Sequence, residues 1–270
     1  MLTVRPLRAP DRESLEGLLA RGGPPDAFLR DTLVAHGIGD FFGAFEGDEL
    51  VGASYLRRGA ICAASQTLRR AARPLASAMS AKSAWGSVVG PEAPCGDIVA
   101  ALRGGGERFR VDRVQKFMYV PRGATLGPGE PRLRSARPED LDALVPIVQR
   151  YRVEDGLARR SDPATSWVRD HTEERIRAGH VWVVVENGAI VFTGAFNFLG
   201  PFGAGLGGIY TVPEARGQGL ASRGTAEMCR IALAEGPVAT LHVDPGNTAA
   251  LRAYARAGLR PEGGFRLTFR

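Results

Sequence analysis

Arg216-Gly217-Gln218-Gly219-Leu220-Ala221 is the stretch of this chain that says most about its fold. It follows an apolar run from Leu206 to Val212 and a Pro-Glu-Ala turn, and it opens a helix-compatible run. Glycines let backbone N–H groups approach an anion closely, and the positive end of a helix dipole favours negative charge. A strand, a glycine-bearing loop and a helix start in this order predict a phosphate cradle.

A second glycine cluster lies just upstream, at residues 203–208. It formally matches the Gly-x-Gly-x-x-Gly pattern of dinucleotide sites. Such a site needs the glycines after a strand and at the start of a helix. An apolar strand, Ile209 to Val212, follows here instead, so we exclude a dinucleotide site. We expect residues 203–208 to form a flexible loop before that strand.

A second motif runs from Leu241 through Asn247 and Tyr254 to Leu259. It is similar to the fifth strand and following helix of the GNAT N-acetyltransferases, Leu-x-Val-x-x-x-Asn-x-x-Ala-x-x-x-Tyr-x-x-x-Gly-Phe. Arg-x-x-Gly-x-Ala at Arg216 resembles the pyrophosphate loop of the same family. Leu259 replaces the usual Phe, which is a conservative packing change. The resemblance covers residues 132–270, about half of the chain.

This resemblance implies an acyl-CoA-dependent N-acyltransferase of the EC 2.3.1 type, which moves acetyl directly from acetyl-CoA to a primary amine. Tyr254 corresponds to the family's proton donor to the departing thiolate, a role suited to a phenol with an ordinary pKa of about 10. The implied acetyl-CoA contacts are Tyr210, Thr211, Val212, Arg216, Gly217, Gln218, Gly219, Leu220, Ala221, Asn247 and Tyr254.

The general base is not evident from the sequence. Many family members carry a Glu on the fourth strand, whereas Leu206 to Val212 contains none. Glu154 is our first candidate, because the segment around it lines acceptor sites in the family. Other candidates are Asp155, Glu173, Glu174 and His242. The missing Glu leaves a second hypothesis open, a non-catalytic acyl-CoA-binding regulatory protein, against which Tyr254 argues.

The chain repeats its opening pattern. A segment with Pro and acidic residues leads into an amphipathic helix after Arg5 and again after Arg134, and a hairpin follows each time. The hairpin turns are Glu-Gly-Asp at Glu46 and Glu-Asn-Gly at Glu186, and Asn-Gly is a strong hairpin signal. In the second half, a helix is expected between the opening helix and the hairpin, from Asp162 to about residue 178.

We therefore predict an α/β (α+β) protein with two GNAT-like domains, each a mixed, mostly antiparallel sheet flanked by helices. The boundaries are 1–120 for the first domain, 121–131 for a Pro- and Gly-rich linker, and 132–270 for the acetyltransferase domain. Residues 117–120 would be the last strand of the first domain and 265–269 that of the second. Gly90-Pro91 is interpreted as a turn. The first half lacks a cradle loop, which predicts a degenerate domain without its own CoA site.

Composition sets the remaining expectations. The chain has 44% hydrophobic and 24% charged residues, as in soluble globular proteins, and no apolar run of membrane-spanning length. Its start does not resemble a signal peptide, so we expect a cytoplasmic protein. The net charge of +6 suits a polyanionic cofactor, and scattered Arg residues without interleaved aromatics do not indicate a nucleic-acid partner. Three Cys and four His form no metal pattern. The expected partners are acetyl-CoA and a small-molecule or peptide amine, with a homodimer left open.

Overall fold

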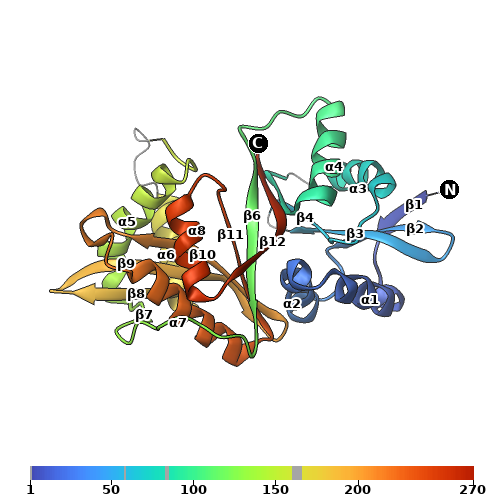
Figure 1. Ribbon diagram of the computed structural model, residues 1–270. Helices are drawn as coiled ribbons and strands as arrows, with labels where there is room; N and C mark the ends of the chain where they lie inside the picture. Colours follow the sequence, from blue (N-terminus) through green and yellow to red (C-terminus); the bar gives the residue numbers. More distant parts are fainter. Residues whose placement is uncertain (1, 58, 83–84, 160–165) are drawn as a thin grey trace.

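The fold is described from a computed structural model, which covers residues 2–57, 59–82, 85–159 and 166–270 (Figure 1). The first half contains β1 (Leu2–Pro6), α1 (Arg12–Gly22), α2 (Ala27–His36), β2 (Phe41–Glu46), β3 (Glu49–Arg57), β4 (Ala60–Ala63), α3 (Arg69–Lys82), β5 (Ser87–Pro91), α4 (Glu92–Gly104) and β6 (Val111–Pro121). Short 3-10 turns precede α1 and α2.

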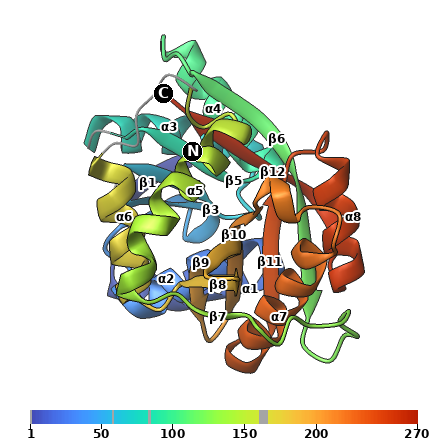
Figure 2. The same ribbon diagram turned by 90° about the vertical axis from the view of Figure 1, so that its left-hand side faces the viewer.

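The second half repeats the plan. It contains β7 (Arg134–Ser135), α5 (Leu141–Glu154), α6 (Ser166–Arg177), β8 (Val181–Glu186), β9 (Ala189–Gly200), β10 (Gly203–Thr211), α7 (Leu220–Glu235), β11 (Val238–Val243), α8 (Thr248–Ala257) and β12 (Arg260–Phe269). The expected start of α6 at Asp162 lies outside the described residues. Figure 2 shows α5 and α6 on one side of the second half's strands and α7 and α8 on the other.

The repeated opening is built by the same side-chain contacts in both halves. Arg5 forms an ion pair with Asp11 at 2.6 Å, and Asp11 accepts from the backbone N–H of Arg8 at 2.8 Å. Arg134 pairs with Asp140 at 2.7 Å, and Asp140 accepts from the N–H of Arg137 at 2.7 Å. Each carboxylate satisfies N–H groups at a helix start and ties the first strand to the first helix. The internal repeat therefore extends to individual hydrogen bonds.

The twelve strands of the described residues form one sheet, in the order β1-β2-β3-β4-β5-β12-β6-β11-β10-β9-β8-β7. β6 of the first half pairs antiparallel with β11, and β12 of the second half pairs antiparallel with β5. β6 and β12 also pair with each other at the centre of the molecule (Figure 1). Each half thus contributes its last strand to the other half's sheet. The mixed, mostly antiparallel character of the sheets is confirmed, but the two expected sheets are joined edge to edge.

This exchange changes where two expected strands lie. Residues 117–120 are in β6, as expected, but they pair with β11 and β12 and with no strand that precedes them in the first half. Residues 265–269 are in β12 and pair with β5. The sequence could not reveal this, because the alternation of a strand does not specify which edge it joins.

Two glycine-rich segments are strands, which corrects our expectations. Residues 203–208, expected as a flexible loop, begin β10. A Cβ on Gly205 would overlap the Phe198 ring, and one on Gly207 would overlap the Asn197 side chain. These glycines therefore permit close packing of β10 against β9 side chains. Gly90-Pro91, interpreted as a turn, ends strand β5.

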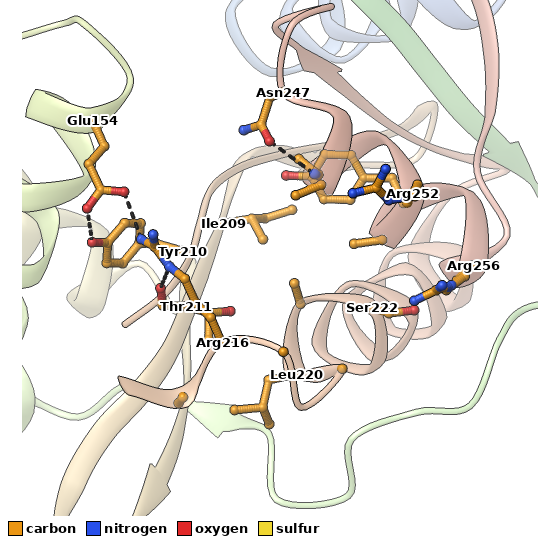
Figure 3. A pocket seen from close by; sticks show the side chains of 18 of the residues that line it. Glu154, Ile209, Tyr210, Thr211, Arg216, Leu220, Ser222, Asn247, Arg252 and Arg256 are labelled. Carbon is orange, nitrogen blue, oxygen red and sulfur yellow. Dashed lines mark hydrogen bonds and ion pairs between the residues drawn. The ribbon is translucent and has the colours of Figure 1, made fainter. Parts of the chain in front are cut away.

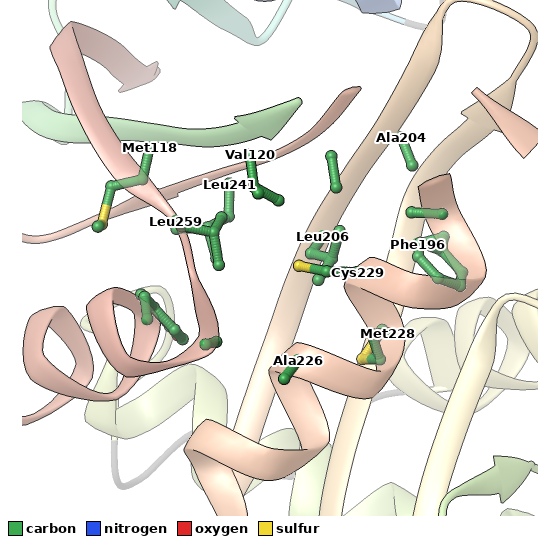
Figure 4. Close-up of a cluster of buried hydrophobic side chains, with 14 of the residues drawn as sticks. Met118, Val120, Phe196, Ala204, Leu206, Ala226, Met228, Cys229, Leu241 and Leu259 are labelled. Carbon is green, nitrogen blue, oxygen red and sulfur yellow. The ribbon is translucent and has the colours of Figure 1, made fainter. Parts of the chain in front are cut away.

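The largest apolar core lies under α7 and α8 (Figure 4). Leu206 of β10, Leu241 of β11 and Cys229 of α7 meet there. Met118 and Val120 of β6 are 2% and 0% exposed in this same core. Truncating such a side chain to Ala typically costs about 2–5 kcal/mol. The first half therefore supplies part of the second half's hydrophobic core.

Candidate functional site

A pocket of about 560 Å³ opens where the sequence motifs converge (Figure 3). β10 and β11 pair in parallel only at Ala204 and Gly205, and the pocket lies where β10 has left its neighbour. Its walls come from the end of α5, the end of β10, the glycine loop, the first turn of α7 and one face of α8. They are lined by Tyr151, Glu154, Asp155, Ile209, Tyr210, Thr211, Ala215, Arg216, Gly217, Gly219, Leu220, Ala221, Ser222, Asn247, Ala249, Ala250, Arg252, Ala253, Tyr254 and Arg256.

The glycine loop has the geometry of an anion cradle. Gly217 and Gly219 have φ of +80° and +77°, a region that residues with a Cβ rarely adopt. Gly219 is the N-cap of α7, and nothing lies within 4 Å of a Cβ built on Gly217. The first N–H groups of a helix have no partner within the helix. The N–H groups from Gly217 to Ser222 are therefore available to an anion at the positive end of the dipole.

Arg216 is held beside the loop by a short network (Figure 3). Its Nη2 lies 2.7 Å from Glu154 Oε2, and its Nε donates to the carbonyl of Thr211 at 3.1 Å. Tyr210 donates its hydroxyl to Glu154 Oε1 at 2.6 Å. Partial burial raises the pKa of Glu154, but the hydrogen bonds from Tyr210 and Arg216 outweigh it and leave the pKa below its ordinary value. Glu154 is thus a carboxylate that braces the loop and a weak proton acceptor.

Three phenols line the pocket, and two of them, Tyr151 and Tyr254, are not bonded to Glu154 as Tyr210 is. Tyr254 of α8 is 8% exposed, and burial, with smaller contributions from Tyr151 and Asp155, raises its pKa well above the ordinary value. Burial raises the pKa of Tyr151 to about 12. Both side chains are therefore protonated at neutral pH and can donate a proton or a hydrogen bond into the pocket.

Most of the predicted contact residues lie at the pocket, and two do not. Asn247 lines it while its Oδ1 caps α8 by accepting from the N–H of Ala250 at 3.0 Å. Val212 does not line it, and its N–H donates to Val191 of β9 at 3.1 Å. Gln218 does not line it either, and its carbonyl accepts from Arg223 at 2.8 Å.

The other base candidates are held in different environments. Asp155 accepts from Arg113 Nη2 at 2.6 Å, and burial nevertheless raises its pKa. His242 is bonded through Nδ1 to Gln115 Oε1, and burial lowers its pKa to about 4. Arg113 and Gln115 both belong to β6, so the first half's exchanged strand holds two side chains of the second half.

Glu173 and Glu174 lie on α6 and line no part of this pocket. Glu173 is ion-paired with Arg177 one turn along the helix.

Sequence reasoning missed Arg252 and Arg256, which line the pocket from α8. The available signal was their spacing, since residues three or four apart share one helix face, here the face that also carries Ala249 and Ala253. The two arginines bring positive charge to the side of the pocket opposite Arg216 (Figure 3). No local pattern in the sequence indicated that Arg113 and Gln115 of the first half contact Asp155 and His242. Only the exchange of strands brings these side chains close together.

In the first half, the loop that corresponds to the glycine loop is closed by side chains of the first half itself. The segment after β4 leads into α3, and the carboxylate of Asp26 accepts there from the N–H of Ser65 at 2.8 Å and from its hydroxyl at 2.9 Å. Asp26 is fully buried, which raises its pKa to about 6. A carboxylate of the chain itself thus takes the donors at this loop.

The family model of the acetyltransferase (GNAT) family matches residues 143–259. Residues 143–259 are a GNAT domain. The match includes β10, the glycine loop, α7 and the whole of α8, so all the residues that line the pocket lie within it. Membership of this domain implies acyl transfer from an acyl-CoA donor. No curated protein matches the sequence.

Solved structures with the same fold span the whole chain. A GNAT-family acetyltransferase from Colwellia psychrerythraea is 16% identical over 100% of both chains, with a TM-score of 0.56. A GCN5-related N-acetyltransferase from Sphaerobacter thermophilus is 16% identical over 100% of this chain and 95% of its own, with a TM-score of 0.60. A tandem GNAT protein from the clavulanic acid biosynthesis pathway is 14% identical over 100% and 97%, with a TM-score of 0.51. The first half therefore has a second GNAT-like fold beside the GNAT domain.

Two further findings bear on partners. None of the helices within the described ranges is long and apolar enough to cross a membrane. The residues placed by the structure include no group of His, Cys, Asp and Glu side chains that could hold a metal ion.

Proposed function

We propose that this protein is an N-acetyltransferase that moves acetyl from acetyl-CoA directly to a primary amine. The observation that carries the proposal is the glycine loop. Its positive-φ glycines and the start of α7 face a pocket that also holds Tyr254. A diphosphate fits the donors from Gly217 to Ala221 because the space beside Gly217 is open.

The remaining contacts follow from the pocket walls. The pantetheine arm would run along Tyr210 and Thr211 and reach past Asn247. Val212, at the end of the strand, would border the arm without donating a hydrogen bond to it, because its backbone N–H is bonded to Val191. Arg216 would add charge beside the loop, and Gln218 would shape it. Arg252 and Arg256 offer positive charge to phosphate groups farther along the cofactor.

The chemistry then follows from Tyr254. The neutral amine nitrogen attacks the thioester carbonyl carbon, the C–N bond forms and the C–S bond breaks. The Tyr254 hydroxyl donates its proton to the leaving sulfur, and the proton lost by the nitrogen returns to the phenol through water. Burial raises the pKa of this phenol, which keeps it protonated before the step but makes it a weaker acid than an ordinary phenol. The return of the nitrogen's proton to the phenol must therefore accompany its transfer to sulfur.

Glu154 is placed to brace Arg216 more than to accept a proton from the amine. Its ion pair with Arg216 and its lowered pKa favour a bracing role. These same observations favour the second candidate function, an acyl-CoA-binding protein without turnover.

Two measurements on the same protein separate the two functions. Calorimetry with acetyl-CoA on the full chain measures binding, and release of free thiol in the presence of a panel of amines measures turnover. Saturable binding with thiol release is the expected result. Binding without release for any amine would favour the non-catalytic function, and absence of binding would refute both.

A further inference from the structure

Two cavities lie between the halves of the molecule, apart from the CoA pocket. The inner one has a volume of about 240 Å³ and the outer one about 600 Å³. They share five lining residues, Phe28, Ala60, Cys62, Asn197 and Phe198, and therefore lie side by side. The two adjacent cavities together are called the passage. α2 of the first half packs against β9 and β10 here, so both halves form its walls.

The inner cavity ends at the place where β10 and β11 separate. Gly205 and Thr240 are the last parallel pair of these strands, and both line the cavity. Farther along β10, Ile209 and Tyr210 line the CoA pocket. The inner cavity and the CoA pocket thus both border the place where β10 and β11 separate. The inner cavity borders it at the last paired residues, and the CoA pocket borders it farther along β10.

The inner cavity is apolar. Four phenylalanines line it, Phe28, Phe117, Phe198 and Phe265, and no Asp, Glu, Lys or Arg does. Three of its polar side chains already have partners: Thr240 donates to the carbonyl of Ala204 at 2.9 Å, Asn197 Oδ1 accepts from Arg175 at 3.1 Å, and His242 Nδ1 is bonded to Gln115 Oε1. A charged or strongly hydrated ligand would lose its water there without gaining partners.

The outer cavity is charged. Asp31, Glu174, Arg57 and Arg175 line it together with three histidines. Asp31 Oδ1 accepts from the N–H of Phe202 at 2.9 Å, while its Oδ2 is buried and has no hydrogen bond within the part of the chain that is described. The carboxylates of Asp31 and Glu174 place negative charge in the wall of this cavity, which attracts an ammonium group.

We propose that the acceptor enters through this passage and that the inner cavity binds the apolar body of a small primary amine, so that the first half forms one wall of the acceptor site. The proposal rests on the proposed acetyl transfer. Pockets for drug-sized ligands measure roughly 300–1,000 Å³, so a cavity of about 240 Å³ suits a body of about one ring. The expected class is an aliphatic or aromatic monoamine, as opposed to a polyamine or an amino acid.

The same environment explains how the amine could lose its proton although Glu154 is a weak proton acceptor. Transfer of an ammonium group from water to an apolar cavity lowers its pKa, because burial penalises the charged form. The amine would therefore lose its proton to water as it passes from the charged outer cavity into the apolar inner one, and reach the strand separation as the neutral nucleophile. His242, neutral in this cavity, keeps a lone pair on Nε2 because Gln115 Oε1 accepts from Nδ1–H.

The proposal is tested by placing larger side chains on the wall of the passage that the first half forms. Ala60 lines both cavities from β4, so Ala60→Trp blocks their junction and Ala60→Leu narrows it. Val34→Trp is the matched control, because Val34 is 55% exposed and lines neither cavity. The probes are phenethylamine, hexylamine, spermidine and glycine, and thermal melting identifies a variant that fails to fold.

We expect phenethylamine and hexylamine to exceed spermidine and glycine in kcat/KM by roughly tenfold or more. Ala60→Trp should lower kcat/KM for phenethylamine by roughly tenfold through KM, Ala60→Leu by less, and neither should change the Kd of acetyl-CoA. Preference for spermidine or glycine, or an unchanged KM in a folded Ala60→Trp, would overturn the proposal while leaving acetyl transfer intact. Calorimetry of phenethylamine with the protein alone tests the cavity even if no turnover occurs. Binding that Ala60→Trp abolishes supports the cavity, and absence of binding refutes it.

Discussion

The contact between Arg113 and Asp155 gives the sharpest prediction about how the two halves depend on each other. Arg113 on β6 donates to the carboxylate of Asp155 at 2.6 Å and to its carbonyl oxygen at 2.7 Å. The two side chains are 22% and 25% exposed. We predict that Arg113→Met destabilises the protein at neutral pH, because it leaves the half-buried carboxylate of Asp155 without its counter-charge.

The magnitude follows from these contacts. A hydrogen bond to a charged group contributes about 1.5–3 kcal/mol, and breaking a fully buried ion pair costs about 3–5 kcal/mol. Water still reaches about a quarter of each side chain here, so the lower part of these ranges applies. We expect a loss of about 2–3 kcal/mol in the free energy of unfolding at pH 7.5.

The loss should depend on pH. Burial already raises the pKa of Asp155 while Arg113 lowers it, so the substitution raises the folded-state pKa further. A group with a raised folded-state pKa contributes stability that is fully present below the unfolded-state pKa, about 4, and is lost as pH rises through the folded-state value. The difference between Arg113→Met and the parent protein should therefore be small near pH 4 and reach its full size at neutral pH.

Urea unfolding between pH 4 and 8 measures this, with Lys116→Met as the control. Lys116 is an exposed cation on the same strand, so its substitution removes the same charge from β6 without touching Asp155. An Arg113→Met variant as stable as Lys116→Met across the pH range would refute the reasoning.

Three further predictions concern the CoA pocket. Tyr254→Phe should lower kcat by roughly a hundredfold with the KM for acetyl-CoA little changed, because it removes the proton donor and keeps the ring; unchanged turnover in a thiol-release assay would exclude the role. Glu154→Gln should weaken acetyl-CoA binding severalfold in calorimetry, since Arg216 loses an exposed ion pair worth about 1 kcal/mol or less, and kcat should persist; a large fall in kcat alone would instead identify Glu154 as the base. The full chain should bind one acetyl-CoA, because Asp26 takes the donors at the first half's loop, and a calorimetric stoichiometry of two would contradict this.

The sequence determined the features that are encoded locally. The glycine loop at Arg216 was predictable because positive φ needs Gly and a helix start needs only neighbouring residues. The two hairpins and the repeated Arg–Asp openings were predictable for the same reason, since turn chemistry and periodicity act over a few residues. The glycines of β10 misled us because their close packing against Phe198 depends on a neighbouring strand.

Only the tertiary structure decided how the halves combine. The alternation of β6 and β12 is that of any strand, and nothing in it specifies that each joins the other half's sheet. That exchange brings Arg113 to Asp155 and Gln115 to His242, and it places Phe117 and Phe265 on the passage between the halves. The cofactor loop is therefore readable from one short stretch, whereas the acceptor side depends on contacts between residues more than a hundred positions apart or from different halves. Such contacts have no local periodicity from which they could be predicted.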